Sequence, residues 1–230
     1  NPDAMIRWIA DRLQDRYGEV TRSRSDPLTT LIGTILSQNT NDTNQGRAYA
    51  SLVARFGNLD KVKEAPVEEI AKAIRIGGLH RQKAVRIKQV LERIAQERGS
   101  LDLSFFADLP LDQAMGWLLA SPGVGKKTAG IVLLFSFGKP YFPVDTHIRR
   151  VTRRLGLMGP KEDPHEQMNA LLPKDPMFML RLHLHLIRLG RELCHPRYPE
   201  CPTCPLAITA RGGPRLPERT ESLVCISHSI

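Results

Sequence analysis

The chain has 230 residues, of which 41% are hydrophobic and 25% charged, the composition of an ordinary globular protein. Its 33 Lys and Arg residues against 24 Asp and Glu give a net charge of +9, which favours a polyanionic partner, nucleic acid before membrane. No apolar run approaches the ~20 residues that span a bilayer, and no secretory leader opens the chain. These features predict an intracellular protein that binds no membrane.

The pattern of apolar residues predicts helices through most of the first half of the chain. In order, these helices cover residues 2–17, 28–36, 42–56, 66–75 and 81–98. Residues 58–60 are predicted as a turn, and Gly77-Gly78 breaks the chain before the fifth helix. The break leaves Leu79 and His80 at an exposed bend, where Leu79 either packs at a helix start or acts as an apolar wedge in a base stack.

Ser37–Asn44, a run of short polar side chains, separates the second and third of these helices. Such a run is typical of a loop that caps the following helix, here through Asn41 or Asp42. Amide side chains can also hydrogen-bond to base edges, so Gln38 and Asn39 are candidate readers of a nucleic acid.

Residues 122–127, Pro-Gly-Val-Gly-Lys-Lys, join a predicted helix at 110–119 to an almost wholly apolar helix. The glycines permit a tight turn, and the amides of the turn and of the following helix can hold a phosphate. Lys127 falls in the first turn of that helix, where the dipole disfavours the ammonium form and favours a nucleophilic amine. From this stretch alone, a connector with two solvated lysines is an equally good interpretation.

The second half also predicts helices, after Asp145, at 165–172 and at 177–193, so the fold class is all-α with about ten helices. Asp145 is expected to cap the first of them. Four arginines form a basic stripe or simply a solvated face on that helix, namely Arg149, Arg150, Arg153 and Arg154.

The hairpin Pro-Gly-Val-Gly-Lys-Lys-Thr-Ala, followed after a buried helix by Val-Asp-Thr-His, resembles the helix–hairpin–helix, Gly/Pro-rich, aspartate (HhH-GPD) superfamily of DNA glycosylases. The cysteines near the chain end narrow the resemblance to the endonuclease III branch, over about residues 1–210. The resemblance implies two helical lobes with an active-site cleft between them. A six-helix barrel domain with the hairpin is expected at 24–139, and a second lobe with an iron–sulfur loop and a C-terminal extension at 1–23 and 140–230.

The same resemblance implies a bifunctional DNA glycosylase and AP lyase of base-excision repair that removes oxidised pyrimidines. Lys127 matches the family's nucleophilic lysine and Asp145 its essential aspartate, whereas Lys126 is the weaker candidate for the nucleophile. The lysine forms a Schiff base with the sugar, and β-elimination then cuts the strand. The alternatives are a monofunctional glycosylase for mismatched or alkylated bases and a non-catalytic HhH DNA-binding module.

The expected partner is double-stranded DNA with damaged bases or abasic sites, bound by a monomer in the cytoplasm or nucleoid. In the family, a residue of the Ser-Gln-Asn-Thr loop fills the vacated stack, and Asn39 stands where the best-known members carry the longer glutamine. Thr34 replaces the catalytic glutamate of the adenine-excising branch, which counts against adenine excision. The candidate DNA-binding residues are Gln38, Asn39, Leu79, His80, Gly123, Val124, Gly125, Lys126, Arg149, Arg191 and Arg197.

All four cysteines lie near the chain end, which indicates a metal or cluster site rather than a disulfide scaffold. Cys194, Cys201 and Cys204 reproduce the spacing of the first three ligands of the family's [4Fe–4S] loop, but the fourth position is Ala210. We expect the tail to loop back and supply Cys225 as the fourth ligand. The alternatives are a cluster with a non-cysteine ligand, zinc held by the three cysteines plus His195, or no metal and a free Cys225.

Overall fold

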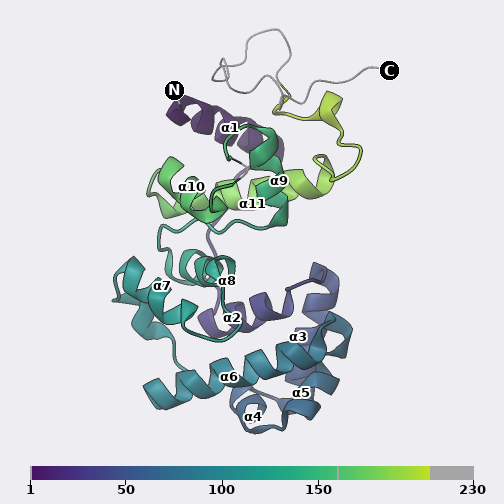
Figure 1. Cartoon of the computed structure of the whole chain (residues 1–230), viewed down its shortest axis with the longest axis vertical. Coiled ribbons are helices and arrows are strands. Elements are labelled where there is room, and N and C mark those ends of the chain that lie inside the picture. The colour runs from purple at the N-terminus through teal and green to yellow at the C-terminus, as the bar shows by residue number, and fades with distance from the viewer. Residues whose placement is uncertain (1, 160, 208–230) are drawn as a thin grey trace. The chain divides into compact units, whose positions relative to one another are not determined.

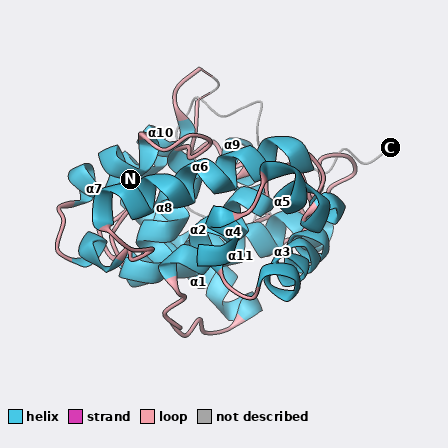
Figure 2. Cartoon of the chain, turned by 90° about the horizontal axis from the view of Figure 1, so that it is seen from below, coloured by secondary structure: helices cyan, strands magenta, loops and turns pink. Residues whose placement is uncertain are grey.

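The computed structural model describes residues 2–159 and 161–207. Every regular element in these ranges is a helix and none is a strand (Figure 2), which confirms the all-α prediction. By contacts, the chain divides into a central unit, Ser23–Lys139, and a terminal unit made of the described residues of Asn1–Arg22 and Pro140–Ile230. Within the described ranges, no helix is both long and apolar enough to cross a membrane.

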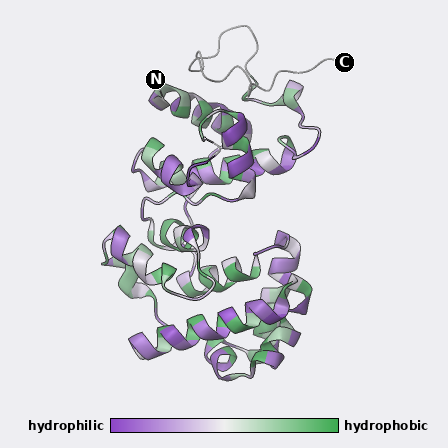
Figure 3. Cartoon of the chain, viewed as in Figure 1, coloured by the Kyte–Doolittle hydropathy of each residue, from purple (hydrophilic) through white to green (hydrophobic). Residues whose placement is uncertain are grey.

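The central unit contains the elements from α2 to η3 (Figure 1), with α2 almost wholly buried from Leu31 to Leu36. Along α6, hydrophobic and hydrophilic residues alternate (Figure 3), and the buried ones pack toward α2, α4 and α5. Its elements are α2 (Pro27–Leu36), α3 (Asp42–Phe56), α4 (Leu59–Glu64), α5 (Val67–Ala73), η1 (Arg75–Gly77), α6 (His80–Arg98), η2 (Ser104–Ala107), α7 (Leu111–Leu119), α8 (Lys126–Ile131) and η3 (Val132–Ser136).

Short polar residues start several of these helices, as the sequence predicts. The Asp26 carboxylate accepts a hydrogen bond from the Thr29 amide at 2.7 Å, and the Asn41 side chain accepts one from the Asn44 amide at 2.8 Å. The predicted turn at 58–60 is wrong, because Asn58 accepts from the Lys61 amide at 2.9 Å and thereby starts α4. An asparagine favours both a turn and a helix start, so its local sequence does not distinguish the two.

The apolar helix after the hairpin changes its winding along its length. After α8, residues Val132–Ser136 form a π-helix, an arrangement that is rare and often found at functional sites. The predicted end at Gly138 is confirmed, since this residue has a φ of 63° and its amide donates to the Leu134 carbonyl at 3.1 Å. The side chain of Lys139 then donates to the carbonyls of Ala107 and Leu109, which fixes the last residue of the central unit.

The terminal unit is built on α11, which contacts both α9 and α1. Asp163 and Asp175 cap α10 and α11, and each is followed by a proline in the first helical turn. The elements of this unit are α1 (Pro2–Tyr17), α9 (Thr146–Arg154), α10 (Pro164–Leu171), α11 (Pro176–Glu192) and η4 (Cys201–Thr203).

His185 of α11 is buried where this helix packs against α1. Its side chain is 3% exposed and its ring lies 5.7 Å from that of Tyr17 in α1. Burial lowers the pKa of His185, and the charges of Arg181 and Arg188 add to this effect. The folded state therefore resists a proton that the unfolded chain accepts at its ordinary pKa of ~6.5.

We predict that the thermal unfolding midpoint falls as the pH is lowered through ~6.5, because protons bind more tightly to the unfolded chain. His185→Leu removes the buried titrating group and should flatten this fall. Calorimetric scans from neutral to mildly acidic pH measure how the unfolding midpoint of the parent and of the variant depends on pH. A variant with the same slope as the parent would show that His185 does not carry the effect.

Candidate functional site

The hairpin between α7 and α8 combines a glycine turn with positive φ and a helix start without a side-chain cap. Gly123 has a φ of 75°, and the Val124 side chain is buried beneath the turn. Gly125 precedes α8 without a side-chain cap, and the amide of Ala129 donates to the Gly125 carbonyl at 3.0 Å. The amides that precede Ala129 in the first turn have no intrahelical acceptor. They form the positive end of the helix dipole and are suited to hold a phosphate.

Lys126 and Lys127 occupy the first turn of α8, and both side chains are half-buried. The next three residues, Thr128–Gly130, are buried and anchor the helix in the central unit. Lys127 is therefore held on a rigid element with its amine end within reach of solvent, the setting that a nucleophilic lysine requires.

The two loops predicted to meet a nucleic acid both lie in the central unit and both carry a non-glycine residue with positive φ. Asn39 is exposed with a φ of 52°, and Leu79 is 48% exposed with a φ of 46°. Asparagine tolerates this left-handed region, whereas leucine adopts it at a cost of about 1 kcal/mol or more. An exposed, strained leucine is not explained by packing within the protein.

Gln38 lies beside the hairpin and not at the tip of its loop. Its Nε2 donates to the Gly123 carbonyl at 3.1 Å, and its Oε1 accepts from Arg86 Nη1 at 2.7 Å. The structure thus brings together the Ser37–Asn44 loop and the hairpin, and it leaves Asn39 as the exposed amide of the pair.

Asp145 lies in the terminal unit as the cap of α9, as predicted, with Oδ1 accepting from the Ile148 amide at 2.7 Å. The cap uses one of the two carboxylate oxygens. The preceding segment is pinned on both sides, because Asn169 exchanges two hydrogen bonds with the Phe142 backbone and His183 Nδ1 lies 3.0 Å from the Pro143 carbonyl. One oxygen of a well-positioned carboxylate is left for another role.

The arginines of α9 divide into two groups. Arg149 is exposed, like Arg191 and Arg197 further along the chain. Arg150 and Arg154 instead face the last turn of α11 and the segment after it, a structural role that the sequence did not reveal. Their hydrogen bonds reach the carbonyls of Gly190, Cys194, His195 and Pro196.

The loop after α11 carries three of the four cysteines. Cys194 is buried, and Arg154 Nη1 donates to its sulfur at 3.2 Å. Burial raises the pKa of the Cys204 thiol, with smaller contributions from the nearby Cys194 and Cys201. Among the described residues, no three His, Cys, Asp or Glu side chains lie close enough together to hold a metal ion. Cys225, the predicted fourth ligand, lies outside the described residues, as does Ala210.

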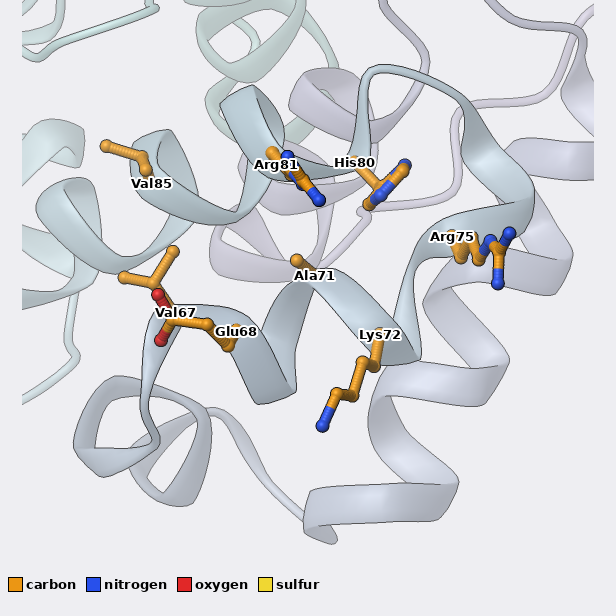
Figure 4. A pocket seen from close by; sticks show the side chains of 8 residues that line it. All are labelled: Val67, Glu68, Ala71, Lys72, Arg75, His80, Arg81 and Val85. Atoms are coloured by element: carbon orange, nitrogen blue, oxygen red, sulfur yellow. The ribbon is translucent and has the colours of Figure 1, made fainter.

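A cavity of about 710 Å³ lies next to the Leu79 bend, between α5 and the first turns of α6 (Figure 4). Of the candidate residues, His80 alone lines it. The basic side chains of Lys72, Arg75 and Arg81 outnumber its one acid, Glu68. The surface beside the bend is therefore basic, which suits a polyanion.

Residues 32–174 match the family described as HhH-GPD superfamily base excision DNA repair protein. The endonuclease III of Thermotoga maritima is 31% identical over 224 residues, which are 94% of this chain and 100% of that protein. The endonuclease III of Sulfolobus acidocaldarius is 39% identical over 180 residues, 76% of this chain and 77% of that protein. A solved structure of an endonuclease III–DNA trapped covalent intermediate has a TM-score of 0.75 at 28% identity, over 89% of this chain and 93% of that one.

We predict that Leu79→Asn leaves the thermal unfolding midpoint unchanged or raises it, because asparagine relieves a left-handed strain of about 1 kcal/mol at an exposed position. Leu103→Asn, at a buried leucine of the same unit, is the matched control and should lower the midpoint strongly. Differential scanning calorimetry measures both. A large loss of stability in Leu79→Asn would mean that this leucine serves the fold.

Proposed function

This chain belongs to the endonuclease III branch of the HhH-GPD superfamily of base excision DNA repair proteins, and we propose that it removes oxidised pyrimidines from double-stranded DNA. It is a DNA glycosylase with AP lyase activity. The observation that carries the proposal is Lys127, which lies in the first turn of α8 directly after the Gly-Val-Gly hairpin. We further propose that it acts as a monomer in the cytoplasm or nucleoid.

In the proposed reaction, the damaged nucleotide is extruded from the duplex and the Lys127 amine attacks its anomeric carbon. A C–N bond to the lysine forms as the glycosidic bond breaks, and the departing base takes up a proton. Opening of the sugar ring gives a Schiff base. Loss of a C2′ proton then expels the 3′ phosphate by β-elimination, and water releases the lysine from the cut strand.

Asp145 is the proposed stabiliser of the positive charge that develops on the sugar as the base departs. Its capping bond through Oδ1 fixes the carboxylate, and Oδ2, which the cap does not use, is assigned to the substrate. The helix cap and the proposed chemical role therefore use different oxygens of one side chain. The pinned segment before Asp145 supports this assignment, since a preorganised charge needs no rearrangement during the reaction.

The proposed DNA contacts follow from exposure and charge. Asn39 would fill the stack that the extruded nucleotide leaves, and Leu79 would wedge the opposite strand. The amides of the hairpin are proposed to hold a phosphate. Further phosphate contacts are assigned to the exposed arginines Arg149, Arg191 and Arg197.

Two other functions would use the same hairpin: a non-catalytic DNA-binding module and a monofunctional glycosylase for mismatched or alkylated bases. Neither needs a lysine at position 127. Adenine excision is also disfavoured, because Thr34 is 7% exposed and its hydroxyl donates to the Thr30 carbonyl at 2.7 Å.

The cofactor that we propose is a [4Fe–4S] cluster held by Cys194, Cys201, Cys204 and, from outside the described residues, Cys225. The first three are cysteines at the spacing of the family's cluster loop, and the backbone amides of Leu206 and Ala207 hydrogen-bond to Cys204. When bound, the cluster would be structural and would take no part in the reaction. It would fix the loop that carries Arg197, which Arg150 and Arg154 already join to α9.

We predict that borohydride traps a covalent adduct with abasic duplex DNA, since reduction captures the Schiff base. Lys127→Ala should abolish the adduct, whereas Lys126→Ala, its neighbour in the same turn, should retain it. Gel electrophoresis of labelled duplexes with oxidised pyrimidines, scored separately for base release and strand cleavage, completes the test. An adduct that survives Lys127→Ala, or base release without cleavage, would contradict the proposed nucleophile.

We predict that Asp145→Asn lowers the rate of base release by about 10²-fold or more, because the charge is lost while an asparagine still caps α9. Asp175→Asn, which changes the capping aspartate of α11 in the same way, is the matched control and should have the parental rate. Single-turnover kinetics measures both. Equal rates in the two variants would show that Asp145 serves as a cap only.

For the cofactor, we predict a yellow-brown protein with about four iron atoms per chain. Cys201→Ser should remove the colour, and Cys225→Ser should weaken it. Visible absorbance and iron analysis measure the outcome. A colourless protein with one zinc that depends on His195 would contradict the cluster and support the zinc site instead.

A further inference from the structure

The amine of Lys83, on α6, lies inside the central unit although lysines are rarely buried without partners. The residue is 0% exposed, and its Nζ donates to the Leu36 carbonyl at 2.7 Å and to the Gly77 carbonyl at 2.8 Å. These carbonyls lie at the ends of α2 and η1. One amine thus joins the backbones that lead into the two exposed loop residues with positive φ, Asn39 and Leu79.

Arg86, one turn further along α6, reaches the hairpin. Its Nη1 donates to Gln38 Oε1 at 2.7 Å, and Gln38 Nε2 in turn donates to the Gly123 carbonyl at 3.1 Å. The Arg86 side chain also lies directly against Gly123, because a Cβ added there would come within 3.0 Å of three of its atoms. A side chain at position 123 would displace this arginine.

The burial of Lys83 is costly for the fold. Burial lowers the pKa of its amine, and the nearby charge of Arg86 adds to the effect. A hydrophobic side chain of similar size would fill the same space without that cost, although it would leave the two carbonyls without a donor. The gain from the lysine is therefore positional, since it fixes two chain segments that are far apart in sequence.

We propose that Lys83, Arg86 and Gln38 form a brace from α6 that holds the Asn39 loop, the Leu79 bend and the hairpin at the spacing needed to engage one damaged site in duplex DNA. The inference rests on the proposed function, in which these three segments fill the vacated stack, wedge the opposite strand and grip a phosphate. Because the brace holds these segments in place before DNA binds, less conformational entropy is lost on binding. Gln38 is then a positioning residue and not a base reader.

The test compares Lys83→Met with Lys88→Met. Lys88 is on the same helix, and its Nζ also donates to two backbone carbonyls, those of Lys63 at 2.6 Å and Ala65 at 2.9 Å. Neither carbonyl adjoins a segment assigned to DNA, so this variant controls for the loss of a lysine–carbonyl contact. Both are assayed as cluster-containing protein, below their measured unfolding temperatures.

The readout is strand cleavage at an abasic site in duplex DNA relative to the same site in a single strand. A single strand has no orphan base to contact and no opposite strand to wedge. Lys83→Met should lower the duplex-to-single-strand ratio about tenfold, a size in keeping with the loss of positioning. Lys88→Met should keep the parental ratio. A duplex with 2-aminopurine opposite the abasic site should show a smaller fluorescence change on binding Lys83→Met than on binding the parent.

If Lys83→Met does not fold, the half-buried Gln38 and Arg86 provide a second route. The single variants Gln38→Ala and Arg86→Ala and their double variant should each lower the ratio, and the double variant should lower it less than the product of the singles, since both break one contact. A parental ratio in Lys83→Met, or in both singles, would overturn the brace. Absence of cleavage on both substrates by the parent protein would overturn the proposed function instead.

Discussion

Two hydrogen bonds from one buried amine, that of Lys83 to the carbonyls of Leu36 and Gly77, fix the irregular parts of the central unit. A helix end leaves backbone carbonyls without intrahelical donors, and burial makes each missing donor costly. The single amine nitrogen of Lys83 donates hydrogen bonds to the carbonyls at two such helix ends. Asn39 and Leu79, three and two residues after these carbonyls, have left-handed backbone conformations.

The terminal unit uses the same arrangement with different side chains. Arg150 and Arg154 donate from α9 to carbonyls in the last turn of α11 and just after it, and Asn169 holds the backbone before Asp145. In each unit a regular helix supplies donors to an irregular segment, which carries Asn39 and Leu79 in the central unit and the cysteines in the terminal unit. Such contacts give side chains on loops a defined position, whereas Lys127 takes its position from α8 itself.

The sequence predicted the features whose causes are local. A cap acts within three residues, so the chain alone assigned the cap of α9 to Asp145 and narrowed the cap of α3 to Asn41 or Asp42. The donors that fix the loops could not be assigned from the chain alone, because Lys83 and Arg154 donate to carbonyls 47 and 41 residues away. A lysine or arginine on an amphipathic helix also normally indicates a solvated face. Its burial becomes visible only when the fold shows which carbonyls need a donor.

The sequence makes Gln38 and Asn39 equal candidates for contact with a base, but the fold gives these two neighbours different environments. Both polar ends of the Gln38 amide are used within the protein, so contact with a base would break two hydrogen bonds. Asn39 is exposed, but its amide extends one methylene less than a glutamine would. A glutamine could reach the vacated base stack even from a displaced loop backbone. The shorter asparagine can reach it only if the loop itself is correctly placed. The short side chain at position 39 therefore makes the proposed recognition depend on the contacts of its neighbour with Arg86 and Gly123.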